Sequence, residues 1–167
     1  MAGRCGTRPC ESTQKCVGTV DIYTCIDTDL EQVLGVPNGG DLGWWMGGEE
    51  CDEGTFAMGY EMKIEANLGQ GDDTALNGIK LICKSLDGTL SNTITSATAP
   101  WGDWTGETYC TGSHGPSFLT SFGLQVDPWT GDGEDDTAAN FIKFKCRDIA
   151  GIHEAYELSK DPGIGDL

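Results

Sequence analysis

Two stretches of the chain, residues 56–65 and 118–127, alternate apolar and polar side chains. Alternation with a period of two predicts strands that bury one face. Each stretch is followed by an acidic turn and then by a second alternating stretch that ends in cysteine, at residues 76–83 and 139–146. The pattern therefore predicts two strand–turn–strand units and an all-β chain.

The two units are copies of one sequence. Asp-Asp-Thr-Ala, then Asn, an alternating stretch and Cys occur within residues 71–83 and again within 133–146. A Gly/Trp turn recurs upstream, and its second Trp precedes a cysteine by six positions in both copies, as Trp45–Cys51 and Trp104–Cys110. An internal repeat of about 60 residues predicts a symmetric all-β assembly.

A third copy begins near the end of the chain. Residues 165–167 repeat Gly40-Asp41-Leu42, and residues 152–158 correspond to residues 90–95. We expect the third repeat to be incomplete and the sequence to be part of a longer polypeptide. The predicted limits are a first module at 1–29 and a repeat domain at 30–167, with repeats at about 33–89 and 90–150 and the third beginning at 151–167.

The cysteine and glycine content indicates a secreted, loop-rich protein. The 167 residues include 25 Gly, which suit tight turns, and eight Cys. Cysteines at this density and in even number favour disulfides formed in an oxidising compartment. Zinc is disfavoured because no Cys-x-x-Cys pair is present. Equivalence of the two copies favours bridges inside each unit, Cys51–Cys83 and Cys110–Cys146.

The net charge of −17 narrows the classes of partner. It excludes nucleic acid, because binding phosphate relies on cationic side chains. It favours cationic proteins, divalent cations, or simple solubility. No apolar run approaches the ~18 residues that a membrane-spanning helix requires.

The first four cysteines follow a separate pattern, Cys5-x4-Cys10-x5-Cys16-x8-Cys25. This spacing resembles the first half of an EGF-like module, and the resemblance implies the bridges Cys5–Cys16 and Cys10–Cys25. The fifth and sixth cysteines of such a module are absent, so a truncated EGF-like module or an unrelated disulfide-rich cap both remain open.

The repeats resemble the vitelline membrane outer layer protein family. The resemblance rests on Trp101-Gly102-Asp103-Trp104, on Cys110, and on the acidic strand motifs that begin at Gly71 and Gly133. It implies a β-prism in which three sheets surround a pseudo-threefold axis. It also implies a structural role in an extracellular coat or matrix, such as an egg envelope, mucus or fibre. An association of the family with transfer of amino-sugar oligomers makes an enzyme a further alternative.

The acidic motif has three interpretations. Asp72, Asp73, Asp135 and Asp136 can accept backbone hydrogen bonds in a turn, with Asn77 and Asn140 closing the network. Alternatively, hard oxygen ligands predict a calcium site, which would use Asp132, Glu134, Asp135 and Asp136. A catalytic carboxylate pair is the third interpretation. Adjacent Asp residues on an extended chain point to opposite sides, which is poor geometry for such a pair. We therefore predict no catalytic residues and no cofactor other than Ca²⁺.

Exposed tryptophans are candidates for binding carbohydrate, because an indole face stacks on the apolar face of a sugar ring. Trp44 and Trp129 have no aromatic counterpart in the other repeat, which favours a surface role, with Asp73 and Asp136 as hydroxyl partners. Trp45 and Trp104 are equivalent in the repeats and are expected to pack inside. Both histidines lie outside any nucleophile motif, although His114 falls in a loop insertion where specificity is plausible.

The sequence therefore favours a secreted structural component of an extracellular coat. Its expected partners are other matrix proteins, including cationic ones, possible glycans, and further copies that pair through an open sheet edge. A lectin-like carbohydrate-binding module and an amino-sugar transferase are the alternatives.

Overall fold

The computed structural model describes residues 4–5, 8–10, 14–18, 23–27, 34–35, 44, 46–65, 74–112, 114–126 and 139–161. Every regular element in these ranges is a β-strand, and none of them contains a helix. The all-β prediction is confirmed, whereas the arrangement of three sheets about one axis stays a prediction.

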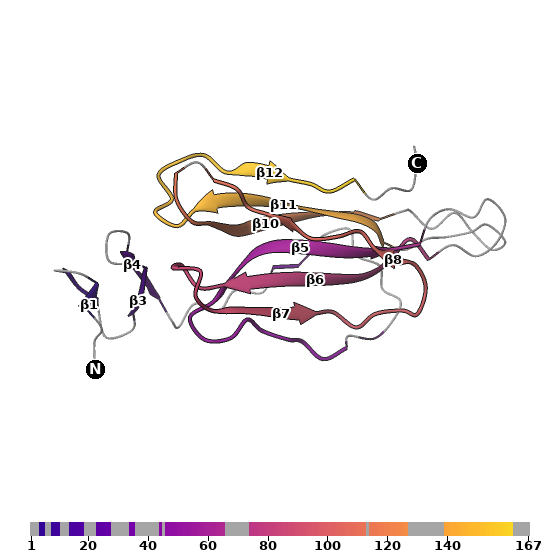
Figure 1. Ribbon diagram of the computed structural model, residues 1–167, viewed down its shortest axis with the longest axis horizontal. Helices are drawn as coiled ribbons and strands as arrows, with labels where there is room; N and C mark the ends of the chain where they lie inside the picture. Colours follow the sequence, from indigo (N-terminus) through magenta and orange to yellow (C-terminus); the bar gives the residue numbers. More distant parts are fainter. Residues whose placement is uncertain are drawn as a thin grey trace.

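Four short strands near the N-terminus form two small sheets (Figure 1). In one of them β1 pairs with β2, and in the other β3 pairs with β4. A disulfide joins Cys10 to Cys25, with 5.6 Å between their Cα atoms. The strands are β1 (Arg4–Cys5), β2 (Arg8–Pro9), β3 (Gln14–Gly18) and β4 (Tyr23–Asp27).

The first repeat supplies the centre of a five-stranded antiparallel sheet. Its order is β7-β6-β5-β8, and β9 also pairs with β5 beyond the end of β8. The strands are β5 (Phe56–Ile64), β6 (Leu76–Lys84), β7 (Ser91–Thr95), β8 (Asp103–Trp104) and β9 (Thr108–Tyr109).

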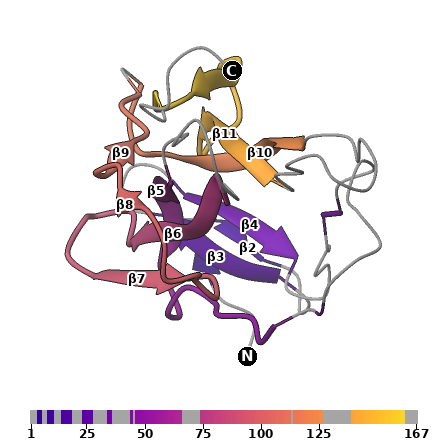
Figure 2. The ribbon, with the colours of Figure 1, turned by 90° about the vertical axis from the view of Figure 1, so that its right-hand side faces the viewer.

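The second repeat supplies most of a three-stranded antiparallel sheet with the order β10-β11-β12. Its strands are β10 (Ser117–Val126), β11 (Ala139–Asp148) and β12 (Tyr156–Leu158). Figures 1 and 2 show this sheet stacked on the first one, with β12 and β7 at opposite outer sides of the pair.

The two long hairpins have the same irregularities at equivalent positions. Pairing of β5 with β6 shifts at Met58, and pairing of β10 with β11 shifts at the equivalent Thr120. A second shift leaves Asn77 unpaired in the first hairpin and Asn140 unpaired in the second. A β-bulge re-aims side chains and increases local twist. The repeat in sequence is therefore a repeat in backbone geometry.

Each sheet is extended by a strand from the following repeat. β7 places Asn92 opposite Cys83 of β6, and β12 places Tyr156 opposite Cys146 of β11. The sheets therefore do not end at the sequence limits of the repeats near residues 90 and 151. Strand pairing couples neighbouring repeats, so that neither sheet forms from one repeat alone.

The core lies between the two sheets. Tyr60, Met62 and Ile64 of β5 pack with Ile142 and Phe144 of β11, and all five are less than one tenth exposed. Burial alternates strictly along β11 from position 140 to position 148, as the sequence pattern predicts. Burying an aliphatic or aromatic side chain of this size contributes about 1.5–3 kcal/mol.

The opposite face of β5 is also covered, which the alternation did not predict. Glu61 is only 7% exposed. Its carboxylate accepts hydrogen bonds from the Lys80 amine at 2.6 Å and from the Gly106 amide at 2.9 Å. The Lys80 amine in turn lies 4.3 Å from the centre of the Trp104 ring. These partners compensate the cost of burying a carboxylate on the face expected to meet water.

Candidate functional site

Each long hairpin is closed by a disulfide at the same place. Cys51 is bonded to Cys83 and Cys110 to Cys146, with 5.8 Å between the Cα atoms in both cases. Both bridges therefore lie inside one unit. Cys83 and Cys146 are fully buried at equivalent positions of β6 and β11. Of the pairs implied for the N-terminal module, Cys10–Cys25 is present, and the side chains of Cys5 and Cys16 lie outside the described residues.

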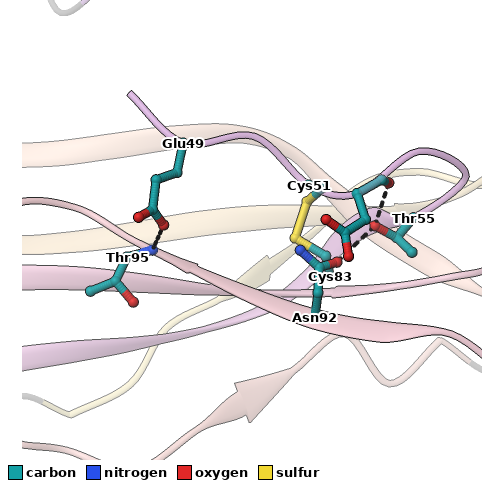
Figure 3. The surroundings of a disulfide bond; sticks show 7 residues. Glu49, Cys51, Thr55, Cys83, Asn92 and Thr95 are labelled. Carbon is teal, nitrogen blue, oxygen red and sulfur yellow. Dashed lines mark hydrogen bonds between the residues drawn. A yellow bond between two sulfur atoms is a disulfide. The ribbon is translucent and has the colours of Figure 1, made fainter. Parts of the chain in front are cut away.

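Hydrogen bonds tie the segment around Cys51 to the edge strand β7 (Figure 3). The Thr55 hydroxyl lies 2.7 Å from the Asp52 carbonyl oxygen and 2.9 Å from the Asn92 side-chain oxygen. The Glu49 carboxylate accepts a hydrogen bond of 2.8 Å from the Thr95 amide. Since β7 is an edge strand, Glu49 occupies a backbone donor that a neighbouring strand would otherwise use.

The tryptophans differ in their surroundings. Trp44 is 94% exposed and Trp101 is 58% exposed, so both offer ring faces to solvent. Trp104 is partly buried beneath Lys80, in line with the packing role expected for it. Trp45 and Trp129 lie outside the described residues, as do their predicted carbohydrate partners Asp73 and Asp136.

Hydrogen bonds join the end of β5 to the start of β6, on either side of residues 66–73. The Thr74 amide and hydroxyl both donate to the Glu65 carboxylate, at 3.1 and 2.6 Å. The Asn77 side-chain amide donates to the Thr74 hydroxyl at 2.6 Å. Asn77 therefore contributes to a network that joins the two strands of the hairpin, whereas the hydrogen bonds predicted for Asp73 and its neighbour in the turn lie outside the described residues.

The predicted calcium ligands Asp132, Glu134, Asp135 and Asp136 lie outside the described residues, as does Asp72. Within the described ranges, no group of three or more His, Cys, Asp or Glu side chains is arranged to hold a metal ion. The calcium site stays a prediction.

A pocket of about 300 Å³ lies between the loop that follows β9 and the connection from β11 to β12. It brings together both histidines of the chain, His114 and His153. Their rings stack with centroids 3.8 Å apart and an angle of 8° between the planes. The lining residues are Thr111, Gly112, His114, Ser117, Asp148, His153, Glu154 and Tyr156.

Asp148 organises one wall of this pocket. Its carboxylate accepts hydrogen bonds from the amides of His153 at 3.1 Å and Ile152 at 3.3 Å, and lies 3.3 Å from the His153 ring nitrogen Nδ1. Burial of Asp148 opposes ionisation, but these two amides and the His153 ring outweigh it and lower the pKa of Asp148 below its usual 3.8. The wall therefore carries a stable negative charge.

Arg147 also binds the segment that connects β11 to β12. Its guanidinium donates to the carbonyl oxygen of His153 at 2.9 Å and to that of Gly151. The segment after β11 is thus fixed by two neighbouring side chains, one on its amides and one on its carbonyls.

Sequence reasoning did not find this pocket. The His114 loop insertion was its one signal, because His153 and Asp148 come from another segment. Asp148 also supplies the orienting group that a Ser–His pair would need. Ser117 nevertheless directs its hydroxyl to the Gly115 carbonyl at 3.4 Å rather than to a histidine, so the geometry is not that of a nucleophile. The pocket is suited to binding a polar ligand.

These features define a class of protein: an all-β repeat protein whose hairpins are closed by equivalent disulfides and coupled by shared strands. The chain belongs to the family described as vitelline membrane outer layer protein I, which matches residues 32–166.

Two relatives illustrate the similarity. The chain is 38% identical over 136 residues to a vitelline membrane outer layer protein 1 homolog of Mus musculus, and 40% identical over 133 residues to one of Homo sapiens. These alignments cover 80% and 75% of this chain, and 65% and 63% of the relatives. The chain thus spans slightly less than two thirds of the length of the proteins it matches. No helix in the described residues is long and apolar enough to cross a membrane.

Proposed function

We propose that the protein is an extracellular structural component of a coat or matrix, of the kind named by the vitelline membrane outer layer of its relatives. The observation that carries the proposal is the pair of equivalent disulfides on hairpins that share strands with the next repeat. Stable disulfides are typical of oxidising, extracellular surroundings. A coat component has to resist unfolding and proteolysis, and this architecture restrains both hairpins.

Rigidity follows from how the strands are held. Local opening is rare where backbone hydrogen bonds and apolar side chains are both buried. Seven of the ten Lys and Arg residues follow residue 30, and six of those seven lie within β5, β6 or β11. Trypsin can therefore reach most of its sites in the repeat domain only after the central strands open.

The charge of −17 supplies a means of assembly. An acidic surface attracts cationic matrix proteins, and salt screens that attraction because the Debye length falls from ~10 Å at 0.1 M to ~3 Å at 1 M. Assembly by this route is therefore salt-sensitive.

The test combines trypsin resistance with assembly. The purified protein is compared with the double variant Cys51→Ala/Cys83→Ala, and each is mixed with a cationic matrix protein at low salt and at ~1 M salt. We expect cleavage after residue 30 to be at least ~10-fold faster in the variant, because the open form becomes more populated. We also expect co-sedimentation at low salt only. Rapid cleavage of the unmodified protein, together with no salt-sensitive co-sedimentation, would rule out the proposed role.

A second candidate function, carbohydrate binding, is favoured by one specific observation, the 94% exposure of Trp44. A free indole face is the group that stacks on a sugar ring. Binding on a glycan array that is lost in Trp44→Ala but kept in Trp104→Phe would support it. If Trp44→Ala binds the same glycans as strongly as Trp104→Phe, Trp44 is not the site.

A further inference from the structure

We propose that the pocket between the His114 loop and the β11–β12 connection binds a guanidinium group, the side chain of an arginine on a cationic partner protein. The inference rests on the proposed function for the biological identity of that partner. It rests on the pocket's own residues for the chemistry of recognition.

The size of the pocket fits a long side chain better than an ion. Its volume of about 300 Å³ is roughly ten times the ~30 Å³ share of one water molecule. It also lies at the lower end of the ~300–1,000 Å³ range of small-molecule sites. The pocket therefore has room for an extended, multi-atom group that enters from solvent.

The charge of the pocket favours a cation. Asp148 and Glu154 both line it, and the chain as a whole carries a net charge of −17. Asp148 already receives two amides, but Glu154 makes no hydrogen bond or ion pair with any described residue. The Arg147 guanidinium directs donors to the carbonyls of Gly151 and His153. One carboxylate in the lining is therefore left to pair with a ligand.

The shape of the lining favours guanidinium over ammonium. The His114 and His153 rings stack face to face, which leaves only the outer face of each ring for a ligand. Tyr156 lines the pocket, and its buried hydroxyl oxygen has no hydrogen-bond partner among the described residues, so it can accept a bond once a ligand displaces the side chains that cover it. A planar guanidinium can stack on a ring and use its fork of five donors for both a carboxylate and a hydroxyl. A compact ammonium group offers no planar face and no fixed fork.

The two histidines also provide the measurement. Because the chain has only two, their ring proton signals in ¹H NMR report on this pocket alone. The full chain is titrated at constant pH and ionic strength with N-acetyl-L-arginine amide, N-acetyl-L-lysine amide and N-acetylglucosamine. We expect saturable shifts of both histidine signals with the arginine probe, at least threefold weaker binding of the lysine probe, and no saturable shift with the sugar.

Three variants assign the interaction to the pocket. Glu154→Gln is expected to weaken the arginine probe about threefold to fivefold, which is the scale of one partly exposed ion pair. Tyr156→Phe is expected to weaken it about twofold to fivefold, on the scale of one hydrogen bond. Glu50→Gln removes an exposed carboxylate elsewhere, so it controls for net charge and is expected to change affinity less than twofold.

The proposal is overturned if the arginine probe gives no saturable shift, or if Glu50→Gln and Glu154→Gln weaken its binding equally. It is also overturned if the sugar or the lysine probe binds as tightly as the arginine probe. Failure here, with trypsin resistance and salt-sensitive co-sedimentation intact, would remove the pocket from assembly and leave the coat function standing. Probe binding by a protein that is cleaved rapidly and shows no salt-sensitive co-sedimentation would leave the pocket standing and remove the coat function.

Discussion

The Tyr60 hydroxyl accepts a hydrogen bond of 2.9 Å from the backbone amide of Lys160, a residue 100 positions further along the chain. Tyr60 is fully buried in β5, and its ring lies 4.7 Å from that of Phe144 in β11. A single side chain of the first repeat therefore packs against the second and binds the segment just after β12. This contact couples the start of the third repeat to the core.

Tyr60→Phe is expected to lower the free energy of unfolding by about 1 kcal/mol at pH 7, because it removes this hydrogen bond and keeps the ring packing. Burial raises the pKa of Tyr60 above 10.0, the Lys160 amide opposes that rise, and the Glu157 charge adds to it. The stabilisation from the neutral hydroxyl is complete below about pH 10 and is lost as pH rises through the folded-state pKa. Urea denaturation at pH 7 and above pH 10 should therefore show that the free energy of unfolding falls less with rising pH in Tyr60→Phe than in the unmodified protein.

Tyr156→Phe is the matched control for this experiment. It removes a buried hydroxyl that has no partner, so the stability at pH 7 should stay the same or rise slightly. If Tyr60→Phe costs no more than Tyr156→Phe, or if its alkaline decline matches that of the unmodified protein, the Tyr60–Lys160 contact contributes nothing to stability.

The two hairpin disulfides are expected to stabilise the protein equally. They close loops of 32 and 36 residues, for which chain entropy gives about 4 kcal/mol each. The double variants Cys51→Ala/Cys83→Ala and Cys110→Ala/Cys146→Ala should therefore lose similar free energies of unfolding in urea. A difference above about 2 kcal/mol would show that the equivalent positions are not equivalent in energy, and that one hairpin dominates the fold.

Gly102→Ala is expected to be among the most destabilising glycine substitutions. Gly102 has φ +74°, and a Cβ there would lie 2.4 Å from the backbone carbon and oxygen of Ile64 in β5. Left-handed backbone costs about 1–2 kcal/mol for a residue with a Cβ, and the overlap with backbone adds about 1–3 kcal/mol. This close approach explains why the Trp-Gly-Asp-Trp turn needs glycine.

Gly88→Ala separates the two contributions. Gly88 has φ +72°, but nothing lies within 4 Å of the position of its Cβ. Thermal or urea unfolding should show a loss of about 1–2 kcal/mol for Gly88→Ala and at least about 1 kcal/mol more for Gly102→Ala. Equal losses would mean that β8 moves away from β5 at no cost.

The sequence was sufficient to predict the two long hairpins because the patterns that mark them lie within short stretches of the chain. Alternation marks the strands, and the repeat places equivalent residues at the same bulges, as at Asn77 and Asn140. The equivalent cysteines follow from the same comparison, since the motif ends at Cys83 in one copy and Cys146 in the other.

The remaining features depend on contacts between distant segments, which no local pattern encodes. The addition of β7 to β6, and of β12 to β11, is set by packing between repeats. Glu61 occupies a position that alternation assigns to solvent, and only the approach of Lys80 and Gly106 makes its burial possible. The pocket likewise needs His114 and His153 to meet across two connections.

Asp87 is expected to make the β6–β7 hairpin sensitive to acid. Its carboxylate accepts hydrogen bonds from the Ser85 hydroxyl at 2.5 Å, from the Thr89 amide at 3.0 Å and from the Thr89 hydroxyl at 2.8 Å. The bond from the Ser85 hydroxyl, followed by those from Thr89, lowers the pKa of Asp87 from 3.8 to about 2. The ionised Asp87 carboxylate therefore stabilises the folded protein fully above about pH 4, and this stabilisation is lost as the pH falls toward 2.

Asp87→Asn should accordingly reduce the difference in unfolding free energy between pH 6 and pH 3, because the asparagine does not titrate. Glu50→Gln, an exposed carboxylate for which the structure shows no hydrogen bond, controls for the loss of one negative charge from a protein of charge −17. NMR titration of the Asp87 carboxyl carbon gives the pKa directly. A midpoint near 3.8, or the same acid sensitivity in Asp87→Asn and the unmodified protein, would show that the Ser85 and Thr89 hydrogen bonds do not hold the carboxylate in solution.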